Sequence, residues 1–142
     1  MFDPPVIDFD PGQDRLDLRG LPILTDADDY EGIHIAVRNL SVDFHKVTGR
    51  KADVWTSTTD RPLTPGLILI GSLKRCRYLR ELAAGGCNFS GICGQWESFE
   101  VSLRDCPWSF ADHMLVIAGS DKRGAIFGAY TLSEQMGVSP HE

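Results

Sequence analysis

The sequence predicts an α/β fold, and three observations support this prediction. Apolar residues recur at steps of three and four along residues 28–48, as on one face of an amphipathic helix. Two wholly apolar runs, 67–70 and 114–118, have the length and composition of strands buried on both faces. Each run is followed by a Gly-Ser pair and then by a second helical pattern. The resulting order, βαββαββα, is typical of a sheet with helices packed on it.

Composition and charge limit the classes of protein that this chain can represent. The 142 residues are 42% hydrophobic and 24% charged, with a formal net charge of −6, which suits a single domain around one core. Binding that follows a phosphate backbone needs clustered Lys and Arg, whereas the 14 basic residues here are scattered. The longest apolar runs fall far short of the roughly 18 residues of a membrane span. We therefore expect neither a nucleic-acid nor a membrane partner.

Residues 1–20 predict an irregular lead-in with one short strand at 6–9. One proline pair and a Pro-Gly step interrupt this segment, and such residues favour turns. The first twelve residues contain three Asp, three Pro and no basic residue, so the charged start of a secretory signal is missing. We expect no signal peptide in this chain, and its compartment stays open.

The strongest periodic pattern predicts a helix over 28–48, after a short apolar run at 21–24. Asp28 and Glu31 have the spacing of a capping box, and Gly49 suits the end of the helix. We expect the apolar stripe of this helix to pack on the sheet. Its members are Tyr30, Ile33, Val37, Leu40, Phe44 and Val47.

The remaining pattern predicts four strands and two helices. The last helix contains Gly124 and Gly128, whose spacing predicts close packing against the sheet. The segment before it alternates between apolar and polar residues, as in a half-buried strand. The predicted strands are 52–58, 67–70, 96–103 and 114–118, and the predicted helices are 74–84 and 121–136.

The acidic residues near the start of the first helix are interpreted as structural. Asp26, Asp28, Asp29 and Glu31 lie where a helix N-terminus favours negative charge. They lack the regularly spaced oxygen ligands of a calcium loop. We therefore predict helix capping here and no metal site.

Two further pairs of titratable residues are poorly placed for chemistry. His34 and His45 are separated by three helical turns, about 16 Å, which is too far to share a metal ion. Glu97 and Glu100 lie an odd number of residues apart on a predicted strand, so they point to opposite faces and cannot act as an acid and base pair. We predict no catalytic, cofactor-binding or metal-binding residue in this chain.

The four cysteines show no C-x-x-C spacing, which argues against a zinc site. Free thiols are the favoured interpretation. A disulfide between Cys87 and Cys93 is the alternative, and the other two cysteines are Cys76 and Cys106.

Three stretches together resemble the N-terminal domain of glycoside hydrolase family 115, the xylan α-1,2-glucuronidases that remove (4-O-methyl)glucuronic acid from xylan side chains. The first begins with TDADDYEGI and covers 25–49, and the second includes the Gly-Ser pair at 71–72 and GQWESF at 94–99. The third runs from AGSDKRG to LSEQMGVSP over 118–140 and is the most specific. The resemblance covers residues 21–140.

The resemblance implies a two-layer α+β arrangement, a mixed sheet with helices packed on it, similar to the small domain that precedes the barrel in hexosaminidases and α-glucuronidases. It implies a non-catalytic role without a cofactor, because the catalytic carboxylates of the family belong to a TIM barrel that follows. We expect a lead-in at 1–20, one accessory domain at 21–140 and a truncated tail at 141–142. The implied partner is that barrel, and glucuronoxylan is reached only through it. Family members are often secreted.

The alternative is a free-standing module that binds carbohydrate or a partner protein without enzymatic activity. Such a module would be expressed on its own, whereas an accessory domain would be continued by a Trp-rich barrel sequence. The sequence downstream of codon 142 distinguishes these two interpretations.

Residues Asp121, Lys122, Arg123 and Gly124 are the predicted seam with the barrel. Asp121 can cap the last helix, and Gly124 permits a close approach to a neighbour. The two cations lie at a helix N-terminus, where their charge is unfavourable and has no local explanation. The family resemblance favours a contact between Arg123 and a carboxylate or backbone carbonyls of the barrel. The alternative is that both cations extend into water.

Overall fold

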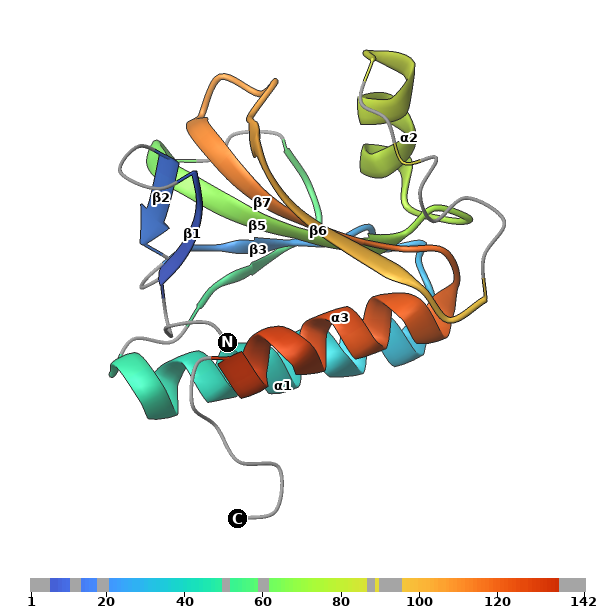
Figure 1. The fold of residues 1–142 in the computed structure, drawn as a ribbon, viewed down its shortest axis with the longest axis horizontal. Coiled ribbons are helices and arrows are strands. Elements are labelled where there is room, and N and C mark those ends of the chain that lie inside the picture. Colours follow the sequence, from blue (N-terminus) through green and yellow to red (C-terminus); the bar gives the residue numbers. More distant parts are fainter. Residues whose placement is uncertain are drawn as a thin grey trace.

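The protein is represented by a computed structural model, which describes residues 6–10, 14–17, 21–49, 52–58, 62–86, 89 and 96–135. A mixed five-stranded sheet of order β4-β3-β5-β7-β6 carries three helices (Figure 1). The first four of these strands are parallel, and β6 runs antiparallel at one edge. This confirms the predicted α/β class with a mixed sheet. The strands are β3 (Ile23–Leu24), β4 (Val54–Trp55), β5 (Thr64–Ser72), β6 (Phe99–Asp105) and β7 (Ala111–Gly119), and the helices are α1 (Glu31–Thr48), α2 (Arg77–Ala84) and α3 (Lys122–Gln135).

The two wholly apolar runs form the centre of the sheet. Leu67 pairs with Met114 in the parallel ladder of β5 and β7, and the ladder continues to the end of both strands. Every side chain at 67–70 and 114–118 is fully buried, as predicted for strands covered on both faces. Both strands extend beyond the predicted runs, because backbone pairing also includes less apolar residues at their amino ends.

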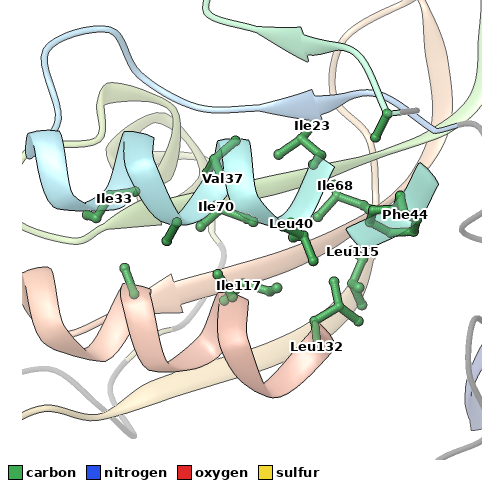
Figure 2. Close-up of a cluster of buried hydrophobic side chains, with 14 of the residues drawn as sticks. Ile23, Ile33, Val37, Leu40, Phe44, Ile68, Ile70, Leu115, Ile117 and Leu132 are labelled. Carbon is green, nitrogen blue, oxygen red and sulfur yellow. The ribbon is translucent and has the colours of Figure 1, made fainter. Parts of the chain in front are cut away.

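Helices α1 and α3 lie side by side on one face of the sheet (Figure 1). The apolar stripe of α1 packs there against alternate residues of the central strands, and Phe44 is fully buried (Figure 2). This confirms the predicted packing of the stripe, except that the side chain of Val47 lies outside the described part of the structure. The labelled members of this core are Ile23, Ile33, Val37, Leu40, Phe44, Ile68, Ile70, Leu115, Ile117 and Leu132.

The second face of the sheet carries helix α2 and a group of aromatic side chains. Leu79 and Leu82 of α2 belong to a separate core with Leu67 and Leu69, the alternate residues of β5. Trp55, Tyr78, Trp108 and Phe110 join this core through ring contacts 5.6–6.3 Å between centroids. The sheet is therefore buried on both faces, and α1 and α2 lie on opposite sides of it.

Two glycines allow α3 to lie very close to its neighbours. A Cβ atom at position 128 would lie 2.4 Å from Cγ2 of Ile117 in β7, well inside van der Waals contact. A Cβ atom at position 124 would lie 2.0 Å from the carbonyl oxygen of Ser98. The predicted close packing is confirmed for Gly128 against the sheet, and Gly124 makes an equally close contact with the segment before β6.

The predicted capping box is wrong. Helix α1 begins at Glu31 with Tyr30 at the N-cap, and no side chain caps it. The nearby carboxylates of Asp26 and Asp29 are bound to other partners, described below, so Asp28 and Glu31 do not form the reciprocal pair. The two-residue strand β4 is likewise much shorter than the predicted 52–58, because its partner β3 is itself only two residues long.

The lead-in contains more regular structure than predicted. Strand β1 (Val6–Asp10) pairs antiparallel with β2 (Asp14–Asp17) in a separate two-stranded sheet. The polar, charged sequence of β2 has low strand propensity, so only its pairing with β1 reveals it. In the part of the chain that the structure describes, no helix is long and apolar enough to cross a membrane.

Candidate functional site

The loops after β3, β5 and β7 lie together at the carboxyl edge of the sheet. The loop after β3 leads to α1 on one face, whereas the loop after β5 leads to α2 on the other. Ligands of open α/β sheets usually bind where neighbouring strands diverge in this way. This edge is therefore the candidate site.

Asp29 connects the first two of these loops. Its carboxylate accepts hydrogen bonds from the backbone N–H of Ser72, at 2.9 Å, and from the Ser72 hydroxyl, at 2.8 Å. It also accepts the N–H of Tyr30, at 2.8 Å. A Cβ atom at position 71 would lie 2.6 Å from Cys76 and 3.1 Å from the Asp29 carboxylate, so Gly71 is needed for this approach. The function of Asp29 visible here is to join two loops.

Asp26 binds the N-terminus of α2 rather than that of α1. Its carboxylate accepts the N–H of Arg77 at 2.7 Å and that of Asp28 at 2.9 Å, and it lies 3.5 Å from Nε of Arg77. Burial would raise the pKa of Asp26, but these hydrogen bonds and the Arg77 guanidinium outweigh it and lower the pKa. The prediction that the acidic residues cap the helix that follows them is therefore wrong, because Asp26 accepts the first N–H of α2 and Asp29 binds Ser72.

The ring of Tyr30 lies between two cations at this edge. The guanidinium of Arg75 is 4.4 Å from the ring centroid, and Nζ of Lys122 is 6.0 Å from it. His34 lies beside the same loop, with Nε2 at 2.7 Å from the carbonyl oxygen of Asp26. His45 is exposed further along α1. Among the described residues no cluster of His, Cys, Asp or Glu could bind a metal ion.

The predicted seam lies at the start of α3. Asp121 caps this helix, because its carboxylate accepts the N–H of Gly124 at 2.8 Å. It also accepts the N–H of Glu97 at 3.1 Å, and these bonds, chiefly the one from Gly124, lower the pKa of Asp121. Ser98 and Ser120 exchange two further hydrogen bonds. Residues 97 and 98 are thereby held at the N-terminus of α3.

The two cations of the seam have local contacts, which the sequence analysis did not anticipate. Arg123 donates to the carboxylate of Glu97 at 2.7 Å in an exposed ion pair. Lys122 lies against Tyr30, as described above. The expectation that both cations lack a local role is therefore wrong, because the N–H of Glu97 binds Asp121 and thereby holds Glu97 beside the start of α3. Glu97 precedes β6 and has a left-handed φ of 51°, while Glu100, within the strand, pairs with Arg104 at 3.1 Å.

Trp96 is a feature of this surface that sequence reasoning missed. Trp96 is 86% exposed and directly precedes Glu97, the partner of Arg123. The signal available in the sequence was a tryptophan in a stretch otherwise rich in Gly, Ser and charged residues. Single exposed hydrophobic residues are common on protein surfaces, but tryptophan is enriched among the residues that contribute most to binding at interfaces.

The described cysteines are free thiols. Cys76 is buried beside Gly71, and burial raises its pKa to about 12, so it is a poor nucleophile. Cys106 is half-buried, and burial also raises its pKa. Cys87 and Cys93, the alternative disulfide, lie outside the described residues.

Comparison with solved structures finds a neighbour of similar fold. It is a family GH115 4-O-methyl-alpha-glucuronidase with specificity for decorated arabinogalactans, which matches with a TM-score of 0.62 and 22% sequence identity. The match covers 87% of this chain but 14% of the glucuronidase chain. The likeness establishes a shared fold with part of that enzyme. No protein-family model matches the chain, and no curated protein sequence matches it.

Proposed function

We propose that the chain is the non-catalytic N-terminal domain of a glycoside hydrolase similar to the xylan α-1,2-(4-O-methyl)glucuronidases, and that it is inactive alone. The observation that supports this most strongly is the asymmetry of the structural match, which spans 87% of this chain and 14% of a glucuronidase. An accessory domain within a larger enzyme predicts this asymmetry. The family motifs at 25–49, 94–99 and 118–140 support the same proposal.

The chemistry of the carboxyl edge supports a non-catalytic role. Glycoside hydrolysis needs two carboxyl groups that face one glycosidic bond at roughly 5 to 10 Å from each other. Asp26 and Asp29 are both buried, and each carboxylate accepts several hydrogen bonds from the protein. Glu97 is paired with Arg123. These carboxylates stabilise loops and are not directed toward a substrate.

The surface around Trp96 is the proposed contact with the catalytic barrel. Trp96 is exposed, yet the two residues that follow it are fixed to α3 through Asp121 and Ser120. Tryptophan and arginine are the residue types that interfaces favour most, which supports a contact at this surface. Of the predicted seam residues, Asp121 and Gly124 contact the segment that follows Trp96, and Arg123 is exposed on the proposed contact surface.

One experiment tests directly whether this chain is part of a larger enzyme. Sequencing of the transcript across codon 142 should find an open reading frame that continues into a barrel rich in tryptophan. A stop codon directly after codon 142 in the mature transcript would contradict the proposal. In a barrel-containing protein, the variant Trp96→Ala can then be compared with the control variant Leu63→Ala. Leu63 is equally exposed, at 86%, but lies at the amino end of β5.

The proposed contact predicts different results for these two variants. Trp96→Ala and Arg123→Ala should lower the melting temperature of the barrel-containing protein and leave that of the 142-residue chain unchanged. Leu63→Ala should have no such differential effect. Equal effects of Arg123→Ala in both forms would show that Arg123 serves this domain alone, through Glu97.

The free-standing binding module remains the second candidate because of Trp96. An exposed indole can stack on a sugar ring, and its N–H can donate a hydrogen bond. Affinity electrophoresis in glucuronoxylan distinguishes the candidates. Retardation of the 142-residue chain that Trp96→Ala abolishes and Leu63→Ala preserves would favour the module, and unretarded migration favours the accessory domain.

A further inference from the structure

Strand β6 presents a long, regular edge. It forms seven consecutive antiparallel pairs with β7, from Phe99 to Asp105, without a bulge. Among the described residues no strand pairs with its outer side. Natural proteins usually protect such edges with proline, lysine, bulges or very short strands. The sequence FEVSLRD contains no proline, lysine or bulge, and its charged residues Glu100 and Arg104 pair with each other, whereas the opposite edge strand, β4, is only two residues long.

The hydrogen bonds at both ends of β6 identify the residues that face outward. Ser98 accepts the N–H of Ser120 at 2.8 Å, and the N–H of Cys106 binds the carbonyl of Asp112 at 3.0 Å. Both bonds follow the register of the β6 and β7 ladder, so the even-numbered residues direct their backbone groups to β7. The odd-numbered residues therefore direct their backbone N–H and C=O groups to the open edge. They are Phe99, Val101, Leu103 and Asp105.

We propose that a second copy of this chain pairs through β6, antiparallel, with the two-fold axis at Ser102. In this register Val101 of one copy exchanges hydrogen bonds with Leu103 of the second copy, and Phe99 does so with Asp105. All four outward-facing residues thereby find partners. Ser102 then faces Ser102 of the second copy in a non-hydrogen-bonded pair, where side chains are closest. The two sheets become one continuous sheet.

Charge complementarity selects this partner and this register. The pairing sets Glu100 of each copy directly opposite Arg104 of the second copy, on the face of β6 that carries Ser102. Glu100 and Arg104 already form an ion pair within one strand, so the dimer would contain a ring of four alternating charges. A shift of the axis to Val101 or Leu103 would remove both cross-strand charge pairs. A strand with unrelated sequence would lack this complementarity.

The other face of β6 is also self-complementary. Val101 and Leu103 point toward the core under α1 and α3 and are only partly buried in one copy. In the proposed register, Val101 of one copy lies beside Leu103 of the second copy, and Leu103 beside Val101. These contacts extend the core across the two-fold axis. Pairing thus removes apolar surface from water on one face and pairs charges on the other.

Sedimentation equilibrium of the 142-residue chain tests the proposal through charge reversal. The unmodified chain should form dimers at micromolar concentration. Glu100→Arg places two arginines opposite each other at both sites, and Arg104→Glu places two glutamates there, so each variant alone should weaken dimerisation at least tenfold. Glu81→Arg on α2 and Lys46→Glu on α1 make the same charge changes at exposed positions away from β6, and should not alter it.

Mixing separates loss of pairing from loss of folding. An equimolar mixture of the Glu100→Arg and Arg104→Glu variants restores both cross-strand pairs and should form heterodimers. The double variant should form homodimers again, because both charges are exchanged together. Thermal unfolding of each variant confirms that it folds. A chain that stays monomeric, or a dimer that the charge reversals do not affect, would overturn the proposal.

Cross-linking tests the position of the axis. Ser102→Cys should give a dimer through a disulfide under mild oxidation, because the two side chains face each other. Glu100→Cys should do so far less, because its partner is position 104. The unmodified chain controls for the existing cysteines. Equal cross-linking of both variants would overturn the proposed register, and a monomer that instead binds an unrelated extended peptide at β6 would overturn the choice of partner.

Discussion

The Asp29 carboxylate binds both the backbone N–H and the hydroxyl of Ser72, although 43 residues separate them. This contact joins the loop that leaves β3 to the end of β5. It is fully enclosed, since Ser72 is inaccessible to solvent and Asp29 is 5% exposed. Together with the bond from Arg77 to Asp26, this contact fixes the position of α2 relative to the loop that leads into α1.

Asp29→Ala should be strongly destabilising. It leaves the hydroxyl and N–H of Ser72 without their acceptor in a buried position, and each such loss costs roughly 1 to 3 kcal/mol. We expect the free energy of unfolding in urea to fall by about 3 kcal/mol. Asp28→Ala on the same loop, with an exposed side chain, is the control. A loss below about 1 kcal/mol for Asp29→Ala would contradict this role.

Gly124→Ala should destabilise the fold although alanine favours helices. The new Cβ atom would lie 2.0 Å from the carbonyl oxygen of Ser98, so α3 or the segment 96–98 must move. Overpacking of this kind typically costs roughly 1 to 3 kcal/mol. Gly85→Ala, where the nearest atom lies at 3.5 Å, is the matched control and should be tolerated. Equal melting temperatures for the two variants would show that α3 is not closely packed here.

Phe44→Ala should remove a large part of the stability of the domain. The ring is fully buried between α1 and the sheet, and truncation of a buried Phe typically costs roughly 3 to 5 kcal/mol. That is enough to unfold a marginally stable domain. His45→Ala, at the exposed neighbouring position, should change the free energy of unfolding by less than about 0.5 kcal/mol. Similar urea midpoints for both variants would refute the placement of the stripe.

The lowered pKa of Asp26 predicts a pH dependence of stability. Because the folded state has a pKa below the ordinary 3.8, the ionised carboxylate adds stability above about pH 3.8, and this stability is lost as the pH falls through the lowered value. Asp26→Asn should therefore lower the free energy of unfolding at pH 7 and have a much smaller effect near pH 2. Urea unfolding at both pH values measures this. A difference that does not change with pH would exclude the ionised form as the stabilising species.

The main helices and central strands could be predicted because their signals are local. The spacing of Ile33, Val37, Leu40 and Phe44 defines one helix face without knowledge of the rest of the chain. The run at 67–70 is apolar throughout, so burial on both faces follows from composition. The edge strand β4 and the hairpin strand β2 have weak sequence patterns, because these strands form only through pairing with a partner strand.

The polar contacts could not be predicted because they join residues that are distant in sequence. Asp26 is an ordinary cap candidate for the nearest helix, but its partner, the N–H of Arg77, lies 51 residues away. Arg123 has no partner within its own turn, and Glu97 reaches it only through the left-handed turn before β6. These pairs form because the folded chain brings the two residues together. A pattern of neighbouring residues in the sequence carries no information about that.

Release of uronic acid from glucuronoxylan tests the proposed non-catalytic role most directly. The purified 142-residue chain is incubated with the polysaccharide, and free glucuronic and 4-O-methylglucuronic acid are measured by ion chromatography against a buffer control. We predict no release above the control, because the Asp26, Asp29 and Glu97 carboxylates are bound within the protein. Release that rises in proportion to protein concentration and disappears after heat denaturation would contradict the account.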